Sequence, residues 1–173
     1  MTKTEENLHA AFAGESMARN KYLIYAAVAR KEGYHYIANI LEETAENERR
    51  HAKDHFKLLG GIGDTVSNLR AAMGGEDYET REMYPNFAKD AESEGNRDAT
   101  ILFKMIAKIE EHHRDRFKKL LEMVEAGTVY KRETAIKWKC SVCGYIHIGK
   151  EPPAVCPACK HPREYYEPAD MDI

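Results

Sequence analysis

The stretch Glu48–His51, ERRH, recurs in this chain as Glu110–His113, EEHH, so the pattern Glu-x-x-His occurs twice. Each copy follows a lone glutamate at almost the same distance, because Glu15 stands 33 residues before the first copy and Glu76 stands 34 residues before the second. Helical residues three positions apart share a face, so each copy directs a carboxylate and an imidazole to one side of a helix. Two such helices and two helices with a lone glutamate supply the ligands of a carboxylate-bridged di-metal site in a four-helix bundle.

Length and composition are consistent with such a bundle and exclude several classes of protein. The 173 residues are 43% hydrophobic and 32% charged, with a net charge of −3. This charge balance gives no reason to expect nucleic acid or a membrane as a partner. The N-terminal residues lack the apolar core of a signal peptide, and the longest apolar stretch, Tyr22–Ala29, is too short to span a bilayer. We therefore expect a cytoplasmic protein.

The first three quarters of the chain are predicted to be helical. Caps, glycines and apolar periodicity predict helices over residues 2–31, 34–59, 66–94 and 97–126. Pro85 is expected to kink the third of these. Residues 60–75 are either a separate crossover or the start of that third helix. Each predicted helix has an apolar stripe, and each stripe contains at least one glutamate where a bundle should have apolar side chains.

Composition changes after Gly127 and indicates a second, smaller domain. We predict an all-α four-helix bundle over residues 1–130, a linker over 131–136 and a β-rich metal domain over 137–173. The last domain is rich in cysteine, proline, glycine and aromatic residues and is too short to fold without a metal.

Glutamates on apolar stripes require compensation, because burying an unpaired carboxylate costs several kcal/mol. Single glutamates on a charged helix are solvated, and a buried ion pair, for example to Arg19, is an alternative for one of them. A set that converges from four helices favours metal binding. Oxygen-rich ligation with one imidazole for each metal suits iron or manganese better than zinc. In this interpretation Glu48 and Glu110 bridge the metals, and Glu15 and Glu76 bind at the two ends.

Helical geometry also selects among the histidines. His51 and His113 lie on the apolar stripes and are predicted ligands. His112 points about 100° away from His113 and is predicted to be solvated. His55, one turn beyond His51, supports the ligands or belongs to the core.

Glu79 is a fifth carboxylate, one turn after Glu76. The charge of an iron pair stays nearly constant if this carboxylate binds in the oxidised state and leaves in the reduced state. We therefore predict that Glu79 is also a ligand, and that it exchanges with neutral His51 on one iron as the redox state changes.

The four cysteines form two Cys-x-x-Cys pairs, a strong signal for a tetrahedral metal site. The predicted ligands are Cys140, Cys143, Cys156 and Cys159. Spacing alone leaves open whether they hold a redox-active iron or a structural zinc. The flanking Gly144-Tyr145 and Pro157 resemble rubredoxin, whereas Lys160 stands where rubredoxins usually have glycine. A neighbouring di-iron site favours an electron-carrying Fe(Cys)₄ centre.

Across nearly its whole length the chain resembles rubrerythrin. The segments that carry the resemblance are Ala11–Ser16, Glu82–Pro85, the two Glu-x-x-His copies, Trp138–Tyr145 and Cys156–Cys159. The resemblance implies a ferritin-like bundle with non-haem di-iron and a peroxidase that reduces hydrogen peroxide to water in oxidative-stress defence. It also implies that His51 exchanges with redox state and that Tyr22 and Tyr84 lie near the irons.

The same resemblance implies how electrons arrive. They come from an external NAD(P)H-dependent reductase or rubredoxin through the Fe(Cys)₄ centre, and no Gly-rich dinucleotide motif is present in this chain. A homodimer or higher oligomer is expected, in which the cysteine domain serves a neighbouring subunit. Two alternatives remain: a ferroxidase or iron-storage bundle with a structural zinc ribbon, and a non-enzymatic protein that uses the zinc ribbon for docking.

Overall fold

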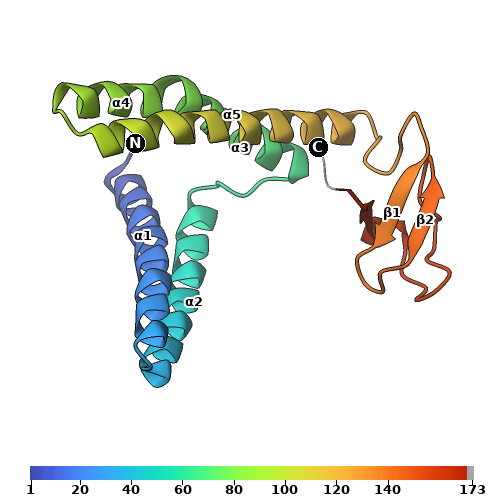
Figure 1. The fold of residues 1–173 in the computed structure, drawn as a ribbon, viewed down its shortest axis with the longest axis horizontal. Helices are drawn as coiled ribbons and strands as arrows, with labels where there is room; N and C mark the ends of the chain where they lie inside the picture. Colours follow the sequence, from blue (N-terminus) through green and yellow to red (C-terminus); the bar gives the residue numbers. More distant parts are fainter. Residues whose placement is uncertain (171–173) are drawn as a thin grey trace. The chain divides into compact units, whose positions relative to one another are not determined.

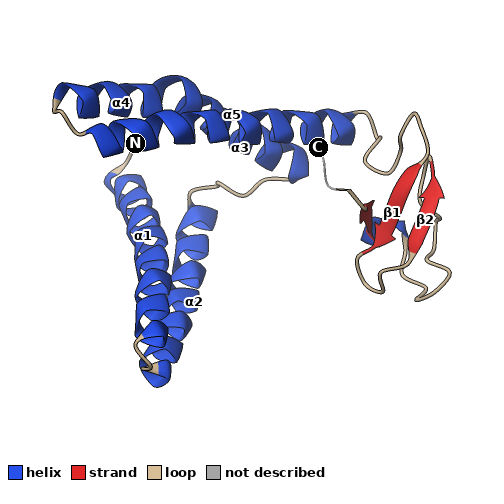
Figure 2. Cartoon of the chain, in the orientation of Figure 1, coloured by secondary structure: helices blue, strands red, loops and turns tan. Residues whose placement is uncertain are grey.

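The computed structural model describes residues 1–170, which form helices followed by a small sheet (Figures 1 and 2). The predicted fold class, an all-α ferritin-like four-helix bundle with a small β-rich metal domain, is confirmed: the chain is mostly helical and ends in a three-stranded sheet. The chain divides into two compact units, residues 1–63 and residues 64 onward. Each unit is described by itself.

The first unit is an antiparallel helix pair, α1 (Lys3–Lys31) and α2 (His35–Leu58), joined by a tight turn (Figure 1). Thr2 begins α1 with a capping box, because its side chain accepts from the Glu5 N–H while the Glu5 carboxylate accepts from the Thr2 N–H. Gly33 ends the helix with φ +88°, a conformation that favours glycine. Alanines at the turn end of the pair are fully buried and let the two helices approach closely.

The helices of the second unit are α3 (Thr65–Tyr78), η1 (Glu79–Met83), α4 (Tyr84–Ser93) and α5 (Arg97–Glu125). Asp64 and Asn96 cap α3 and α5 with side-chain oxygens. Residues 65–75 therefore belong to the third predicted helix, and the connection from α2 covers only residues 59–64. The expected single helix over 66–94 is instead interrupted by η1.

Segment η1 is a π-helical turn, in which the Tyr84 N–H bonds to the Glu79 carbonyl five residues earlier. Such a turn inserts one extra residue into a helix and is frequent at functional sites. The insertion explains why the second Glu-to-Glu spacing is 34 residues rather than 33. It also explains a second difference of one residue: Tyr84 follows Glu76 by eight residues, whereas Tyr22 follows Glu15 by seven. The two halves of the helical sequence are therefore equivalent apart from this turn.

The cysteine domain contains an antiparallel sheet in the order β2-β1-β3. Its strands are β1 (Ile136–Cys140), β2 (Ile146–Gly149) and β3 (Tyr166–Pro168). The core consists of Trp138, Cys140, Cys156 and Tyr166, all nearly inaccessible to solvent. Two of these four residues are predicted metal ligands, which agrees with a domain whose stability depends on its metal.

No helix within residues 1–170 is both long and apolar enough to cross a membrane. The predicted domain boundaries near residues 130 and 137 remain predictions. The last positions of the predicted β-rich domain, 171–173, lie outside the described residues.

Candidate metal centres

Three of the predicted ligands meet between α1 and α2. Ligand atoms of Glu15, Glu48 and His51 all lie within 4.8 Å of one another. His51 Nδ1 is 2.9 Å from Glu48 Oε2 and 3.8 Å from Glu15 Oε1. Glu15 comes from α1, and Glu48 and His51 come from one face of α2. We call these three residues the first trio.

Three further predicted ligands meet between α3 and α5 in the same arrangement. Glu76, Glu110 and His113 also place ligand atoms within 4.8 Å of one another. His113 Nδ1 is 2.6 Å from Glu110 Oε2 and 3.8 Å from Glu76 Oε2. This second trio repeats the first in residue type, helix position and distance, so the duplication seen in the sequence extends to side-chain geometry.

The two carboxylates within each trio are close enough to be hydrogen-bonded to each other. A hydrogen bond with Glu48 raises the pKa of Glu15, while the same bond lowers the pKa of Glu48. In the second trio, burial and then a hydrogen bond with Glu110 raise the pKa of Glu76. Two carboxylates held this close need a proton or a cation between them. A divalent cation would displace the proton, so the trios have the donor chemistry of metal sites.

Glu79 lies outside the second trio and begins the π-helical turn. Its charge nevertheless acts on this site, since it contributes to the raised pKa of Glu76. Tyr84 faces the same group: burial raises the pKa of its hydroxyl, and the charges of Glu79, Glu110 and Glu76 raise it further. The phenol therefore stays protonated at neutral pH and is available as a hydrogen-bond donor. Tyr22 is half-buried on α1.

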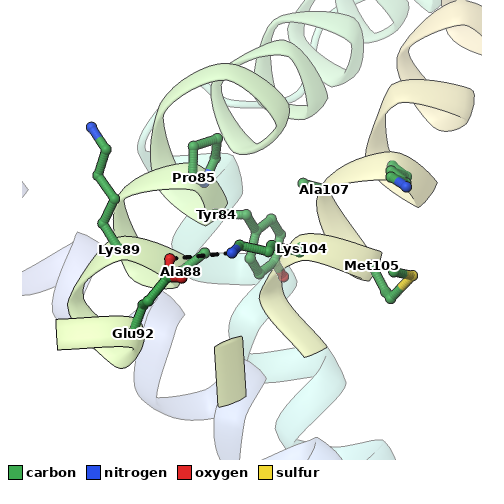
Figure 3. A pocket seen from close by; sticks show the side chains of 9 residues that line it. Tyr84, Pro85, Ala88, Lys89, Glu92, Lys104, Met105 and Ala107 are labelled. Carbon is green, nitrogen blue, oxygen red and sulfur yellow. Dashed lines mark hydrogen bonds and ion pairs between the residues drawn. The ribbon is translucent and has the colours of Figure 1, made fainter. Parts of the chain in front are cut away.

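A cavity of about 410 Å³ lies between α4 and α5, and Tyr84 is one of the residues that line it (Figure 3). Lys104 Nζ and Glu92 Oε2 form an ion pair 3.2 Å long between its walls. Tyr84 thus lines the cavity, and its hydroxyl also experiences the negative charges of the second-trio carboxylates. Sequence reasoning missed this cavity because its lining residues form no motif, and only the packing of α4 on α5 brings them together.

The four cysteines form the third group, with all Sγ atoms within 4.8 Å of one another. Cys140 Sγ is 3.6 Å from Cys159 Sγ, and Cys143 Sγ is 3.7 Å from Cys156 Sγ. A tetrahedron with metal–sulfur bonds of about 2.3 Å has edges of about 3.8 Å. The spacing therefore suits a single tetrahedral iron or zinc.

Two similar turns hold these sulfurs. The Gly144 N–H donates to the Cys140 carbonyl at 2.8 Å, and the Lys160 N–H donates to the Cys156 carbonyl at 3.0 Å. The corresponding φ angles are +76° at Gly144 and +64° at Lys160, the latter being the single positive φ of a non-glycine residue among the described residues. Lys160 therefore occupies a backbone conformation that glycine adopts without strain.

Replacing Lys160 by glycine should stabilise the cysteine domain by about 0.5–1 kcal/mol, because relief of left-handed strain exceeds the entropy cost of glycine. Gly144→Ala, the converse change in the other turn, should destabilise it by about 1 kcal/mol. Trp138 is the sole tryptophan of the chain and lies in this domain, so its fluorescence during urea unfolding of the zinc-loaded protein reports both changes. If the free energy of unfolding rose in both variants, or fell in both, Lys160 would not occupy a strained position that favours glycine.

Tyr166 is a residue of the cysteine site that sequence reasoning missed. Its hydroxyl is buried, has no oxygen or nitrogen partner within the described chain, and lies beside the Cys156 sulfur. Burial raises the pKa of the Cys156 thiol, but hydrogen bonds from Tyr166 and from backbone N–H groups of Cys159 and Ala158 outweigh burial and lower it to about 6. Cys156 is therefore prepared to bind metal as a thiolate.

Both the helical part and the cysteine domain of this chain match known protein families. Residues 6–121 match the rubrerythrin family, and residues 138–167 match the rubrerythrin rubredoxin-like domain. The chain belongs to the rubrerythrin family. It is 46% identical over 180 residues to rubrerythrin of Porphyromonas gingivalis, covering 96% of this chain and 90% of the relative. It is 47% identical over 183 residues to rubrerythrin-1 of Clostridium acetobutylicum, covering 96% of this chain and 94% of the relative.

Among solved structures, fully reduced nigerythrin is 32% identical and covers 97% of this chain and 87% of its own, with a TM-score of 0.38. Rubrerythrin-family membership, with the two trios and the cysteine group, confirms the predicted cofactors, a di-iron centre and a tetrahedral iron on four cysteines. The chain is accordingly an iron-dependent oxidoreductase linked to oxidative stress. The bridging, terminal and exchanging roles of individual ligands remain predictions.

Proposed function

We propose that this rubrerythrin-family chain reduces hydrogen peroxide to water at a di-iron centre formed by the two trios and fed with electrons through the four-cysteine centre. The observation that carries the proposal is the pair of matching Glu-Glu-His trios in one chain with a tetrahedral cysteine group. A storage bundle needs the trios but has no use for a one-electron carrier. Their combination supports a reaction that consumes electrons repeatedly.

The overall reaction joins one peroxide, two electrons and two protons to give two waters. When bound, the two irons supply the electron pair that breaks the O–O bond. The chain's own carboxylates would hold the irons. The protonated Tyr84 hydroxyl, which lies in the field of Glu79, Glu110 and Glu76, would donate a hydrogen bond to an oxygen atom of the bound substrate. Tyr84 also lines the cavity between α4 and α5, which is large enough for solvent and a small substrate.

The electron source lies outside this chain. No Gly-rich dinucleotide motif is present, so an NAD(P)H-dependent reductase or a rubredoxin must deliver electrons to the cysteine centre. The cysteine pattern favours a reducing compartment, since metal thiolates persist where disulfides do not form. We place the protein in the cytoplasm on this ground.

Glu79 and His51 exchange on one iron in this proposal, with Glu79 bound in the oxidised state. Glu79→Gln should therefore slow peroxide turnover by about tenfold and abolish the difference in coordination between oxidised and reduced crystals. Glu82→Gln is the matched control, because Glu82 lies in the same π-helical turn and is exposed. Identical coordination in oxidised and reduced crystals of the unaltered protein would disprove the exchange.

The direct test uses iron-reconstituted protein, reduced and mixed with hydrogen peroxide without oxygen. We expect one peroxide to be consumed for every two electrons, with no oxygen released, and repeated turnover when a reductase and NADH are added. Zinc-substituted protein is the control for non-specific peroxide loss. Oxygen-driven deposition of iron beyond the di-iron centre, without peroxide turnover, would favour the storage function instead.

A further inference from the structure

The connection between α2 and α3 limits which helices one chain can bring together. In a ferritin-like bundle the two helical hairpins are joined by one long crossover, because the second and third helices run in the same direction. The crossover must return along the bundle before the third helix begins. In this chain only residues 59–64 are available for it.

The required span follows from where the ligands lie on their helices. Glu48 precedes the end of α2 at Leu58 by about 15 Å, and Glu76 follows the start of α3 at Thr65 by about 17 Å, at 1.5 Å of rise per residue. If both glutamates bind the same metal pair on parallel helices, the end of α2 and the start of α3 are about 31 Å apart along the axis. The sideways distance between helices, about 8–10 Å, increases the span further.

The connection cannot reach that far. Fully extended, the chain from Leu58 to Thr65 covers at most about 25 Å. Its first part is not extended, because the Gly60 and Gly61 N–H groups bond back to the Lys57 and Phe56 carbonyls, and Gly60 has φ +69°. At its other end, the Asp64 side chain caps α3. The extended part therefore spans only about 14 Å, from Gly61 to Thr65.

The first unit by itself leaves its ligand face open. The His51 side chain is 55% exposed. Ile37 and Ile40, which share this face of α2, are 50% and 45% exposed. In the second unit the His113 side chain is 40% exposed. Exposed apolar side chains on the same helical face as a half-complete ligand set indicate a face that another helix pair covers.

We propose that the di-metal sites form between two copies of this chain, with α1 and α2 of one copy packing on α3, α4 and α5 of the other. A symmetric dimer then contains two bundles, each completed by one first trio and one second trio. Every connection stays short, because α2 and α3 of one chain belong to different bundles. The inference rests on the di-metal site of the proposed function, but not on its reaction with peroxide.

Complementation between two inactive variants tests the exchange of helices. One variant carries Glu15→Ala and Glu48→Ala, and the other carries Glu76→Ala and Glu110→Ala. The two are co-expressed with different tags, and the heterodimer is purified through both. Iron in the intact heterodimer is counted by native mass spectrometry, and circular dichroism checks that each variant keeps its helices.

With helix exchange, one bundle of the heterodimer lacks both trios and the other has both intact. We expect that heterodimer to hold two bundle irons, while each variant homodimer holds none. If each chain closed its own bundle, every bundle would lack one trio and the heterodimer would hold no bundle iron. That result, or wild-type protein that binds a full di-iron centre as a monomer, would overturn the proposal. Wild-type chains with two tags that fail to co-purify would overturn it as well.

A lengthened connection tests the physical cause in chains with both trios. Inserting 14 glycine and serine residues after Gly61 extends the maximum reach by about 45 Å, beyond the required span. Each chain can then close its own bundle, so the same variant pair in this background should lose most of its complementation. If the heterodimer with the lengthened connection bound as much bundle iron as the heterodimer with the natural connection, the short connection would not be the cause of the helix exchange. Both readouts count metal, so they stand even if the protein fails to turn over peroxide.

Discussion

The Cys140→Ser variant is expected to lose reductant-driven peroxide turnover by on the order of 100-fold, while its reduced bundle still oxidises once with peroxide. Cys140 is fully buried in the core of the cysteine domain, and its sulfur lies 3.6 Å from that of Cys159. A serine hydroxyl at this position is a poor ligand for an iron that is bound by three thiolates. The electron path into the bundle is thereby cut without any change to the trios.

Steady-state NADH oxidation with a reductase and a single-turnover peroxide reaction together measure this effect. Val142→Ser is the matched control, since Val142 is exposed in the same cysteine turn and adds a hydroxyl without removing a sulfur. It should retain nearly full turnover. Unchanged steady-state turnover in Cys140→Ser would show that electrons reach the irons by another route.

The Glu110→Gln variant is expected to lose iron from the bundle, with metal affinity reduced by about 100-fold or more. Glu110 accepts from His113 at 2.6 Å, and its side chain is hydrogen-bonded to that of Glu76, so it lies at the centre of the second trio. An amide keeps the shape of the side chain but removes the negative charge that two cations require. The cysteine iron should remain, because it is bound by other residues.

Iron per chain, with the cysteine iron counted separately by its visible absorption, is the measurement for this variant. Glu111→Gln is the control: Glu111 is the next residue on α5, points about 100° away and is exposed. It should bind iron normally. Full di-iron occupancy in Glu110→Gln would exclude a bridging role for this carboxylate.

Local geometry explains why much of this protein could be predicted from its sequence. Glu-x-x-His places two ligands on one helical face whatever surrounds it, so both trios were predicted from spacing, and the structure brings their members together. Helix ends followed from glycines and caps such as Gly33 and Thr2, which act within one turn. The paired Cys-x-x-Cys motifs likewise determine a tetrahedral site through local turns.

Features that depend on contacts between distant segments were decided by the tertiary structure alone. Strand β3 forms because Tyr166 pairs with Cys140 of β1, 26 residues earlier in the chain, and this pairing also places Tyr166 beside Cys156. The cavity at Tyr84 exists because α4 packs on α5, and the π-helical turn, which supplies the extra residue between the two halves, has no local signal beyond Pro85. The sequence by itself determined which candidate ligands share a helical face, since that spacing is a property of single helices. Only the structure showed that α3 begins at Thr65, and this start leaves too short a connection for one chain to span a ferritin-like bundle.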